Sequence, residues 1–287
     1  MSNIFSGLDS MGLGNLSGMK LFEKKEKEVK KMTPASTNII EVKEEDLLFD
    51  KSFTCPVCDK EFKTKTIRTG KIKLLGQDTD LRPRYQHVDS LKYDAVACPY
   101  CGYAALTRFF GPLTSVQTKI VKENISISFR GFSEQPSTYS YDDAIIRHKL
   151  ALANAVIKHA KPSEKAYTCL KIAWLYRGKA EQLPAGTPDI EKIKKELSEQ
   201  ERTFLMQAYL GFNEAFSKEG FPMCGMDELT VTYLVADLAR QCKKYDESLR
   251  MLARVLTSKT ANDRIKTKAR EIKELIREEV EEFKKGR

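Results

Sequence analysis

The sequence lacks several features that would assign it to a familiar class. No apolar run approaches the length needed to span a bilayer. Met1–Met19 lacks the basic start and the continuous apolar block of a secretory signal, so we expect a cytoplasmic protein without a membrane span. A Gly-rich phosphate loop, a nucleophile elbow and a paired-histidine metal motif are also missing. We therefore expect a protein that is not an enzyme.

Cysteine is present in an odd number, seven residues, which leaves one thiol unpaired in any disulfide scheme. Disulfides are also rare in the cytosol. Four of the cysteines stand in two identical spacings, whereas Cys169, Cys224 and Cys242 are scattered. This distribution predicts one metal site plus free thiols, and two of the scattered cysteines lie in helical patterns as small core residues.

The strongest motifs are Cys55-Pro56-Val57-Cys58 and Cys98-Pro99-Tyr100-Cys101-Gly102. Two residues between cysteines allow a tight turn to present both sulfurs to one ion, and zinc prefers four tetrahedral ligands of this kind. Two such turns that face each other form a zinc ribbon. We therefore predict that Cys55, Cys58, Cys98 and Cys101 bind one structural Zn²⁺, with no open position for a catalytic water.

Two other readings of these cysteines stay open. A redox dithiol would use one such pair at the start of a helix in a βαβ unit, a context that this region does not show. Iron bound by four cysteines is the smaller alternative. The 39 residues between Cys58 and Cys98 exceed the usual spacing, so the insert must be structured. We expect a hairpin or two short strands at Lys63–Ile67 and Lys71–Leu75.

The insert contains an unusual polar stretch from Asp78 to His87. Asp78, Asp80 and His87 can in principle bind a second metal or act as acid and base, and Arg82 and Arg84 can hold a phosphate. An enzyme that uses this Asp78–His87 loop is therefore one hypothesis. The favoured interpretation is a solvated loop tip whose Asp and Arg residues pair with each other.

The cysteine region also carries basic charge. Lys51–Phe110 has eleven Lys or Arg and six Asp or Glu, and the aromatic residues Tyr85, Tyr93, Tyr100, Tyr103, Phe109 and Phe110 lie among them. Basic ribbons with exposed aromatic rings bind nucleic acid by phosphate contact and stacking, but small ribbons also need aromatic residues for their cores. The net charge of the whole chain, +9, permits such a partner without establishing it. Nucleic-acid binding is the second hypothesis for function.

From Tyr141 onward the apolar residues recur with helical spacing. Asp142 or Asp143 can cap the first of these helices, and Val121–Phe129 fits either a strand or a helix start. The expected helices cover approximately residues 142–160, 164–181, 190–217, 226–243, 246–258 and 262–285. Together with the cysteine region, this pattern predicts an α+β multidomain fold, a small β-rich zinc ribbon followed by an all-α helical array.

Part of the array resembles a tetratricopeptide repeat, which consists of two antiparallel helices with small residues where they cross. Val235–Arg240 would form the first helix and Tyr245–Val255 the second, with Ser248 at a position that usually holds alanine. A looser copy precedes it, with Ile172, Ala173 and Tyr176 in its first helix and Ala208, Phe212 and Ala215 in its second. The long connection Arg177–Gln200 departs from the family pattern. Stacks of such helices form concave surfaces that bind peptides.

The order of these motifs resembles one bacterial family, domain of unknown function 2225, over roughly residues 45 to 260. The resemblance implies that the four cysteines are metal ligands, and it implies no catalytic residue. The expected domains are a flexible N-terminal tail at 1–45, a zinc-ribbon domain with an inserted hairpin at 46–110, a connecting segment at 111–140 and a tetratricopeptide-like helical domain at 141–287. The leading hypothesis is a non-enzymatic interaction or scaffold protein that binds a protein partner through its helices.

Overall fold

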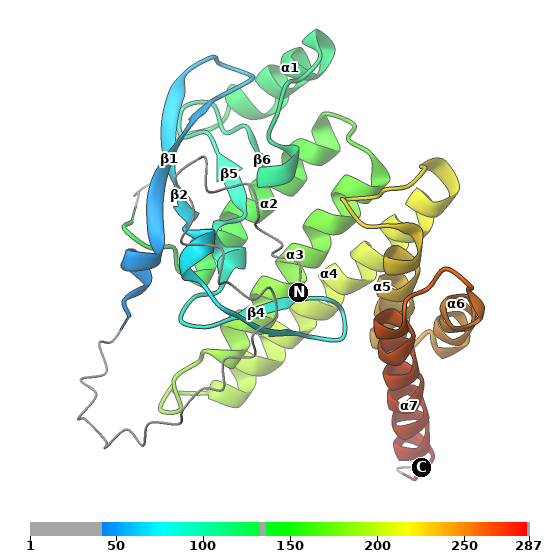
Figure 1. Ribbon diagram of the computed structural model, residues 1–287. Coiled ribbons are helices and arrows are strands. Elements are labelled where there is room, and N and C mark those ends of the chain that lie inside the picture. The colour runs from blue at the N-terminus through cyan, green and yellow to red at the C-terminus, as the bar shows by residue number, and fades with distance from the viewer. Residues whose placement is uncertain (1–41, 133–135, 286–287) are drawn as a thin grey trace, which may run out of the picture. The chain divides into compact units, whose positions relative to one another are not determined.

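The structure, a computed structural model, describes residues 42–132 and 136–285. From Val42 onward the chain forms one compact unit (Figure 1). Most of the expected N-terminal tail, with the short docking segment that Met1–Met19 suggests, lies outside the described residues.

Three short antiparallel strand pairs occupy the N-terminal part. After a 3-10 turn at Glu44–Leu47, strand β1 (Leu48–Thr54) pairs with β2 (Glu61–Ile67). Strand β3 (Leu74–Gln77) pairs with β4 (Pro83–Tyr85), and β5 (Ala95–Ala97) pairs with β6 (Ala104–Leu106). A 3-10 turn at Ser90–Tyr93 precedes β5.

Of the two alternatives for Lys63–Ile67 and Lys71–Leu75, the hairpin is wrong, because the structure has two short strands that do not pair with each other. The first segment lies in β2, but its partner is β1, because the turn at Cys55–Cys58 folds these two strands against each other. The second segment only overlaps the start of β3, which turns back at Asp78–Arg82 to pair with β4. The insert between the cysteine pairs thus contributes β2 of the first hairpin, both strands of the second and β5 of the third.

Helices make up the rest of the chain. Their bounds are α1 Ser115–Val121, α2 Tyr141–Ile157, α3 Pro162–Glu181, α4 Ile190–Lys218, α5 Glu228–Gln241, α6 Tyr245–Thr257 and α7 Asp263–Lys285. A π-helical turn at Lys122–Ser126 continues α1, so the segment 121–129 contains the end of a helix and is neither a strand nor a helix start. Strand pairs followed by helices confirm the predicted α+β class.

Local sequence explains where several helices begin. Ser140, and not Asp142 or Asp143, is the N-cap of α2, and it forms a capping box with Asp143. Asp227 caps α5 by accepting a hydrogen bond from the backbone N–H of Thr230 at 2.7 Å. Pro162 stands in the first turn of α3, where its missing N–H costs nothing.

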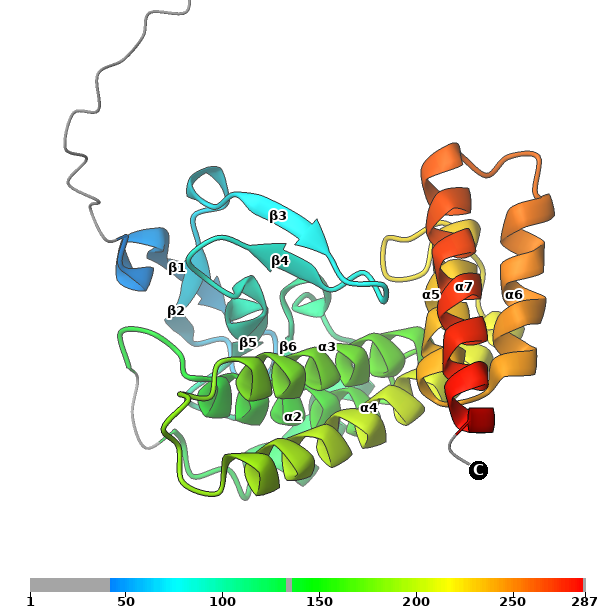
Figure 2. The ribbon, with the colours of Figure 1, turned by 90° about the horizontal axis from the view of Figure 1, so that it is seen from below.

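The main core surrounds α3, which packs against α2 and α4 (Figure 2). Leu170, Ile172 and Leu175 are fully buried there, as expected for a helix too apolar for the surface. At Gly211 of α4, an added Cβ would lie 2.9 Å from the Cβ of Ala166, so glycine permits the close approach of α3 and α4. Helices α3 and α4 match the expected ranges 164–181 and 190–217 closely. Only residues 182–189 separate them, so the connection Arg177–Gln200 that was expected for the looser repeat copy is too long.

Helices α5, α6 and α7 form a second core. The Ser248 hydroxyl on α6 is completely buried and donates to the carbonyl oxygen of Ala236 on α5 at 2.7 Å. A small residue at position 248 therefore lets these helices approach closely. Ala269, Ile272 and Ile276 form the buried face of α7, as the apolar spacing predicts for a terminal helix.

A candidate four-cysteine metal centre

The first pair of cysteines lies in the turn that joins β1 to β2. The turn is closed by two backbone hydrogen bonds, from Asp59 to Cys55 at 2.9 Å and from Cys55 to Lys60 at 3.0 Å. Asp59 leaves the turn with a φ of 58°, in the left-handed region that favours glycine. The hairpin therefore fixes the Cys55 and Cys58 side chains on one side of a tight turn.

The second pair lies in an equivalent turn between β5 and β6. The backbone N–H of Gly102 donates to Cys98 at 3.1 Å, and that of Cys98 donates to Tyr103 at 2.8 Å. Gly102 has a φ of +73°, and a Cβ at this position would lie 2.6 Å from the ring of Phe129. Glycine is thus required here both for the backbone conformation and for space. Asp59 and Gly102 occupy the same position in their turns, four residues after the first cysteine.

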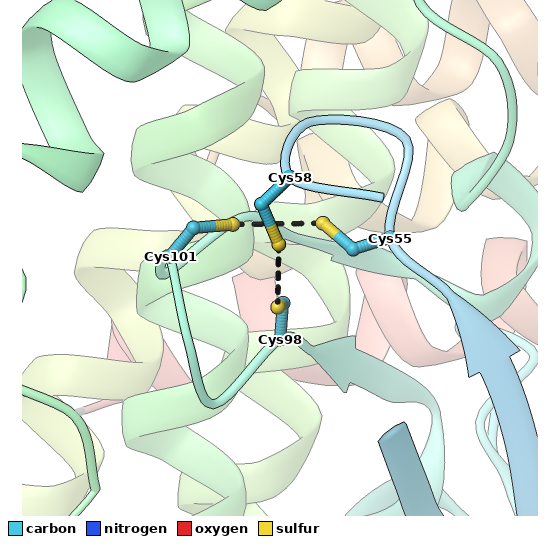
Figure 3. A group of neighbouring side chains, drawn as sticks. All are labelled: Cys55, Cys58, Cys98 and Cys101. Atoms are coloured by element: carbon cyan, nitrogen blue, oxygen red, sulfur yellow. Dashed lines mark hydrogen bonds between the residues drawn. The ribbon is translucent and has the colours of Figure 1, made fainter. Parts of the chain in front are cut away.

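The two turns face each other and bring the four sulfurs together (Figure 3). All four Sγ atoms lie within 4.8 Å of one another, with 3.5 Å between Cys55 and Cys101 and 3.7 Å between Cys58 and Cys98. A tetrahedron with metal–sulfur bonds of about 2.3 Å has edges of about 3.8 Å. The group therefore has the size needed to hold one metal ion. Among the described residues, only these four bring three or more such ligand atoms together.

The environment of the sulfurs favours a bound cation. Cys55 and Cys98 are completely buried, Cys101 is nearly so, and Cys58 is half-buried. Hydrogen bonds with the Cys101 and Cys98 thiols, followed by burial, raise the pKa of Cys55 above its ordinary value. Hydrogen bonds from the Cys101 and Cys55 thiols, supplemented by the backbone N–H groups of Tyr100 and Cys101, lower the pKa of Cys98. Four close sulfurs cannot all ionise here unless a positive charge lies among them.

Helix α2 fixes the second turn from behind, through a residue that the sequence reading did not single out. Asn154 is fully buried, and its side-chain nitrogen donates to the carbonyl oxygen of Gly102 at 3.0 Å and to that of Leu150 at 2.9 Å. A polar side chain within the apolar stripe of this helix was the available signal. This contact connects the cysteine site directly to the helical part of the chain.

The polar stretch Asp78–His87 is not the solvated loop that we expected. Asp80 and Arg82 are 0% and 2% exposed. The Asp and Arg residues do pair with each other, since Arg84 donates to Asp78 at 2.7 Å. They also pair with α3, because Arg82 and Arg84 both contact Glu181. His87 is exposed and does not join them.

Asp80 is the most deeply buried member of this group. Arg177 of α3 binds its carboxylate, and Gln241 at the end of α5 also donates to it, at 3.4 Å. Burial opposes ionisation of Asp80, but Arg177 holds its pKa below the ordinary value. The Tyr233 hydroxyl donates to the neighbouring carbonyl of Thr79 at 2.6 Å. The tip of the insert is thus part of the interior, so Asp78, Asp80 and His87 do not form a second metal site.

The basic and aromatic residues of the cysteine region separate in the structure. Tyr93 and Tyr103 are buried, Tyr85, Phe109 and Phe110 are half-buried, and Tyr100 is exposed. Arg82, Arg84 and Lys92 are held in ion pairs with carboxylates. Most of the aromatic residues therefore belong to the core.

In the part of the chain that the structure describes, no helix has the length and apolar character needed to cross a membrane.

Short strand pairs that carry a four-cysteine site, followed by packed helices, define an α+β protein with a candidate metal centre. The chain belongs to the bacterial family described as "Uncharacterized protein conserved in bacteria (DUF2225)", which matches it over residues 48–276. This confirms the family resemblance read from the cysteine motifs. No curated protein and no solved structure matches the chain.

Proposed function

We propose that Cys55, Cys58, Cys98 and Cys101 hold one structural Zn²⁺, and that the chain is a non-enzymatic scaffold which binds a partner protein through its helices. The observation that supports the metal is the approach of all four sulfurs to within 4.8 Å of one another. Zinc prefers such a tetrahedral set of thiolates. The bound ion would hold the two ends of the insert together. Four free cysteines in one cluster and three elsewhere fit a reducing compartment, the cytoplasm.

Metal analysis of protein purified without added zinc tests the first part. We expect one zinc per chain in the wild type and almost none in Cys98→Ala. Cys242→Ala is the matched control, because this half-buried thiol lies outside the cluster, and it should keep its zinc. Iron in place of zinc, visible as thiolate-to-iron absorption, or a stable wild type without metal, would refute the assignment.

A non-enzymatic role is supported by the ligand set and by the loop at residues 78–87. Four thiolates complete the coordination of a tetrahedral ion, so no site remains for a reactive water. In the loop, Asp80 forms an ion pair with Arg177. Arg82 forms ion pairs with Asp89 and Glu181. Groups engaged in this way are poorly placed to act as acid or base.

The helical array supports a role in protein binding. The α5–α6 pair has the small residue Ser248 at the helix crossing, as in tetratricopeptide-like pairs, and such arrays present surfaces to other proteins. Apolar side chains are also exposed on these helices, among them Leu210 on α4 and Leu249 on α6, which are 52% and 37% exposed. Single exposed apolar residues are common, so a direct test is needed.

Crosslinking and affinity purification from the native host provide that test. We expect Leu210→Glu to reduce recovery of the partner severalfold. Val116→Glu is the control, because Val116 is 67% exposed but lies on α1, outside the array. The same set of proteins recovered in equal amount with both variants would argue against binding through the helices.

Nucleic-acid binding through the ribbon is the second candidate. With Arg82, Arg84 and Lys92 paired, the exposed cations concentrate on the β1–β2 hairpin and the segment after it. They are Lys51, Lys60, Lys63, Arg68, Lys71 and Lys73. Tyr100 is exposed beside Lys60, whose Nζ lies 4.9 Å from its ring centre. A gel-shift titration against ionic strength decides this, and no shift at about 50 mM salt would rule it out.

A further inference from the structure

A pocket of about 210 Å³ lies between the inserted hairpin and helices α5 and α7. Contacts on both sides of it join the insert to these helices, from Lys268 to Gln77 and from Tyr233 to Thr79. Figure 2 shows the β3–β4 hairpin reaching toward this end of the helices. The lining residues are Gln77, Leu81, Thr230, Tyr233, Asn262, Arg264, Ile265 and Lys268.

The charges that line this pocket are not balanced. Arg264 and Lys268 are cations, and no lining residue is an acid. The ion pairs of α7 involve Glu274, Arg277 and Glu279, and within the described residues neither Arg264 nor Lys268 takes part in one. The pocket beside Arg82 provides the contrast, because its three cations meet the carboxylates of Glu44, Asp89 and Glu181.

The position of the two cations is electrostatically unfavourable for the chain alone. Arg264 and Lys268 are four residues apart on one helix, a spacing at which like charges repel. Both lie in the first turns of α7, near the positive end of the helix dipole, and Asp263 is the acid of that first turn. Burial and Arg264 together lower the pKa of Lys268, and Glu271 only partly opposes them. An anion bound in the pocket would reduce both the repulsion between the two cations and their unfavourable interaction with the helix dipole.

The neutral residues add hydrogen-bond donors. The side-chain oxygen of Gln77 accepts from Lys268 at 3.1 Å, and that of Asn262 accepts from the backbone N–H of Ile265 at 2.9 Å. Each amide oxygen therefore already accepts one hydrogen bond, and the amide nitrogen is a donor that each residue can offer to a ligand. Thr230, a residue with a hydroxyl donor, also lines the pocket.

We propose that this pocket binds a phosphate group, with Arg264 and Lys268 as its charged contacts. Two cations and several N–H and O–H donors suit an anion that carries two charges and several acceptor oxygens, and a single carboxylate would leave most of these donors unused. The ligand is inorganic phosphate or a small phosphate monoester. Because the site joins Gln77 of the insert to α7, its occupation would stabilise the contact between them.

Calorimetric titration of the full-length, zinc-loaded chain tests the proposal, with inorganic phosphate in one arm and phenyl phosphate in the other. We expect saturable binding at one site per chain. Arg264→Gln/Lys268→Gln should raise the Kd at least about tenfold, because charged hydrogen bonds are lost. Tighter binding of phenyl phosphate would identify a monoester as the ligand, and tighter binding of inorganic phosphate would identify the free ion. Circular dichroism confirms that each variant is folded.

Arg270→Gln/Lys273→Gln is the matched control, since it removes the same charge from α7 at residues that do not line the pocket. We expect it to leave the Kd unchanged. An equal loss of affinity in both double variants would mean an adventitious ion only, drawn by net charge, and would overturn the proposal. Absence of saturable binding in the wild type would overturn it as well.

Discussion

Arg177 donates to both carboxylate oxygens of Asp80, through Nη1 at 3.2 Å and Nη2 at 2.7 Å, although the two are 97 positions apart in the chain. The same guanidinium also contacts Asp78 and Glu201. A completely buried carboxylate at the tip of the insert is thereby fixed against α3. The insert begins and ends at the cysteine turns, so this ion pair links the four-cysteine cluster to the helices.

Loss of this buried pair should destabilise the whole unit. We expect Asp80→Ala to lower the free energy of unfolding by about 3 kcal/mol, because Arg177 keeps its charge in a buried place without its main partner. Urea unfolding followed by circular dichroism measures the change. Glu214→Gln removes an exposed carboxylate that pairs with Lys218, and its midpoint should match the wild type. A wild-type midpoint for Asp80→Ala would show that the contact is not needed for stability.

Metal removal should affect the helices as well as the ribbon. The turns at Cys55–Cys58 and Cys98–Cys101 hold the two ends of the insert, and Asn154 connects the second turn to α2. We expect chelation to reduce hydrogen-exchange protection first in β1, β2, β5 and β6, and then at the contact of residues 78–84 with α3. Protection of α6 should change least, because its partners are α5 and α7. Equal exchange of the metal-free and metal-bound chains would contradict this coupling.

The left-handed positions of the two turns should respond in opposite ways to substitution. We expect Gly102→Ala to lower the free energy of unfolding by about 1–2 kcal/mol because of the backbone conformation alone. The loss should be larger still, because the Cβ of the new alanine would meet the Phe129 ring. Asp59→Gly should be neutral or slightly stabilising, since glycine adopts the observed φ of 58° without strain. The readout is the rate at which a chelator removes the bound metal, which should rise for Gly102→Ala and not for Asp59→Gly. Equal rates for both variants would show that these positions do not hold the turns.

His148 should make the protein sensitive to acid. The side chain is fully buried on α2, and desolvation lowers its pKa to about 4 from an ordinary value near 6.5. Between these values the unfolded chain binds a proton that the folded chain does not, so stability falls as the pH falls. We expect a loss of about 2 kcal/mol from this group between about pH 7 and about pH 5.

Comparison with His148→Leu isolates this contribution from other acid-sensitive groups, including the cysteine thiolates. The variant has no group to titrate at this position, so its free energy of unfolding should depend less steeply on pH over the same interval. Urea unfolding at both pH values measures the difference. Parallel pH dependence of the two proteins would mean that His148 is not the group responsible.

Much of the candidate site was predictable because it depends on local chemistry. Two residues between cysteines form a tight turn in any suitable hairpin, so the motifs alone gave the four sulfurs that the structure brings together. Helix ranges followed from apolar spacing, and α3 and α7 begin within two residues of their expected starts. The cap of α2 was misassigned to Asp142 or Asp143, because Ser140 and Asp143 form a reciprocal pair that spacing alone does not distinguish.

What the sequence by itself determined are the features set by neighbouring residues, namely the cysteine turns, the helices and the α+β class. The tertiary structure decided which strands pair and which polar residues are buried. Asp80 resembles a solvated loop residue until Arg177 and Gln241, which are distant in the chain, surround it. Asn154 gains its role only when β6 brings the Gly102 carbonyl to α2. The partners of these buried polar groups come from distant parts of the chain, so local spacing does not identify them.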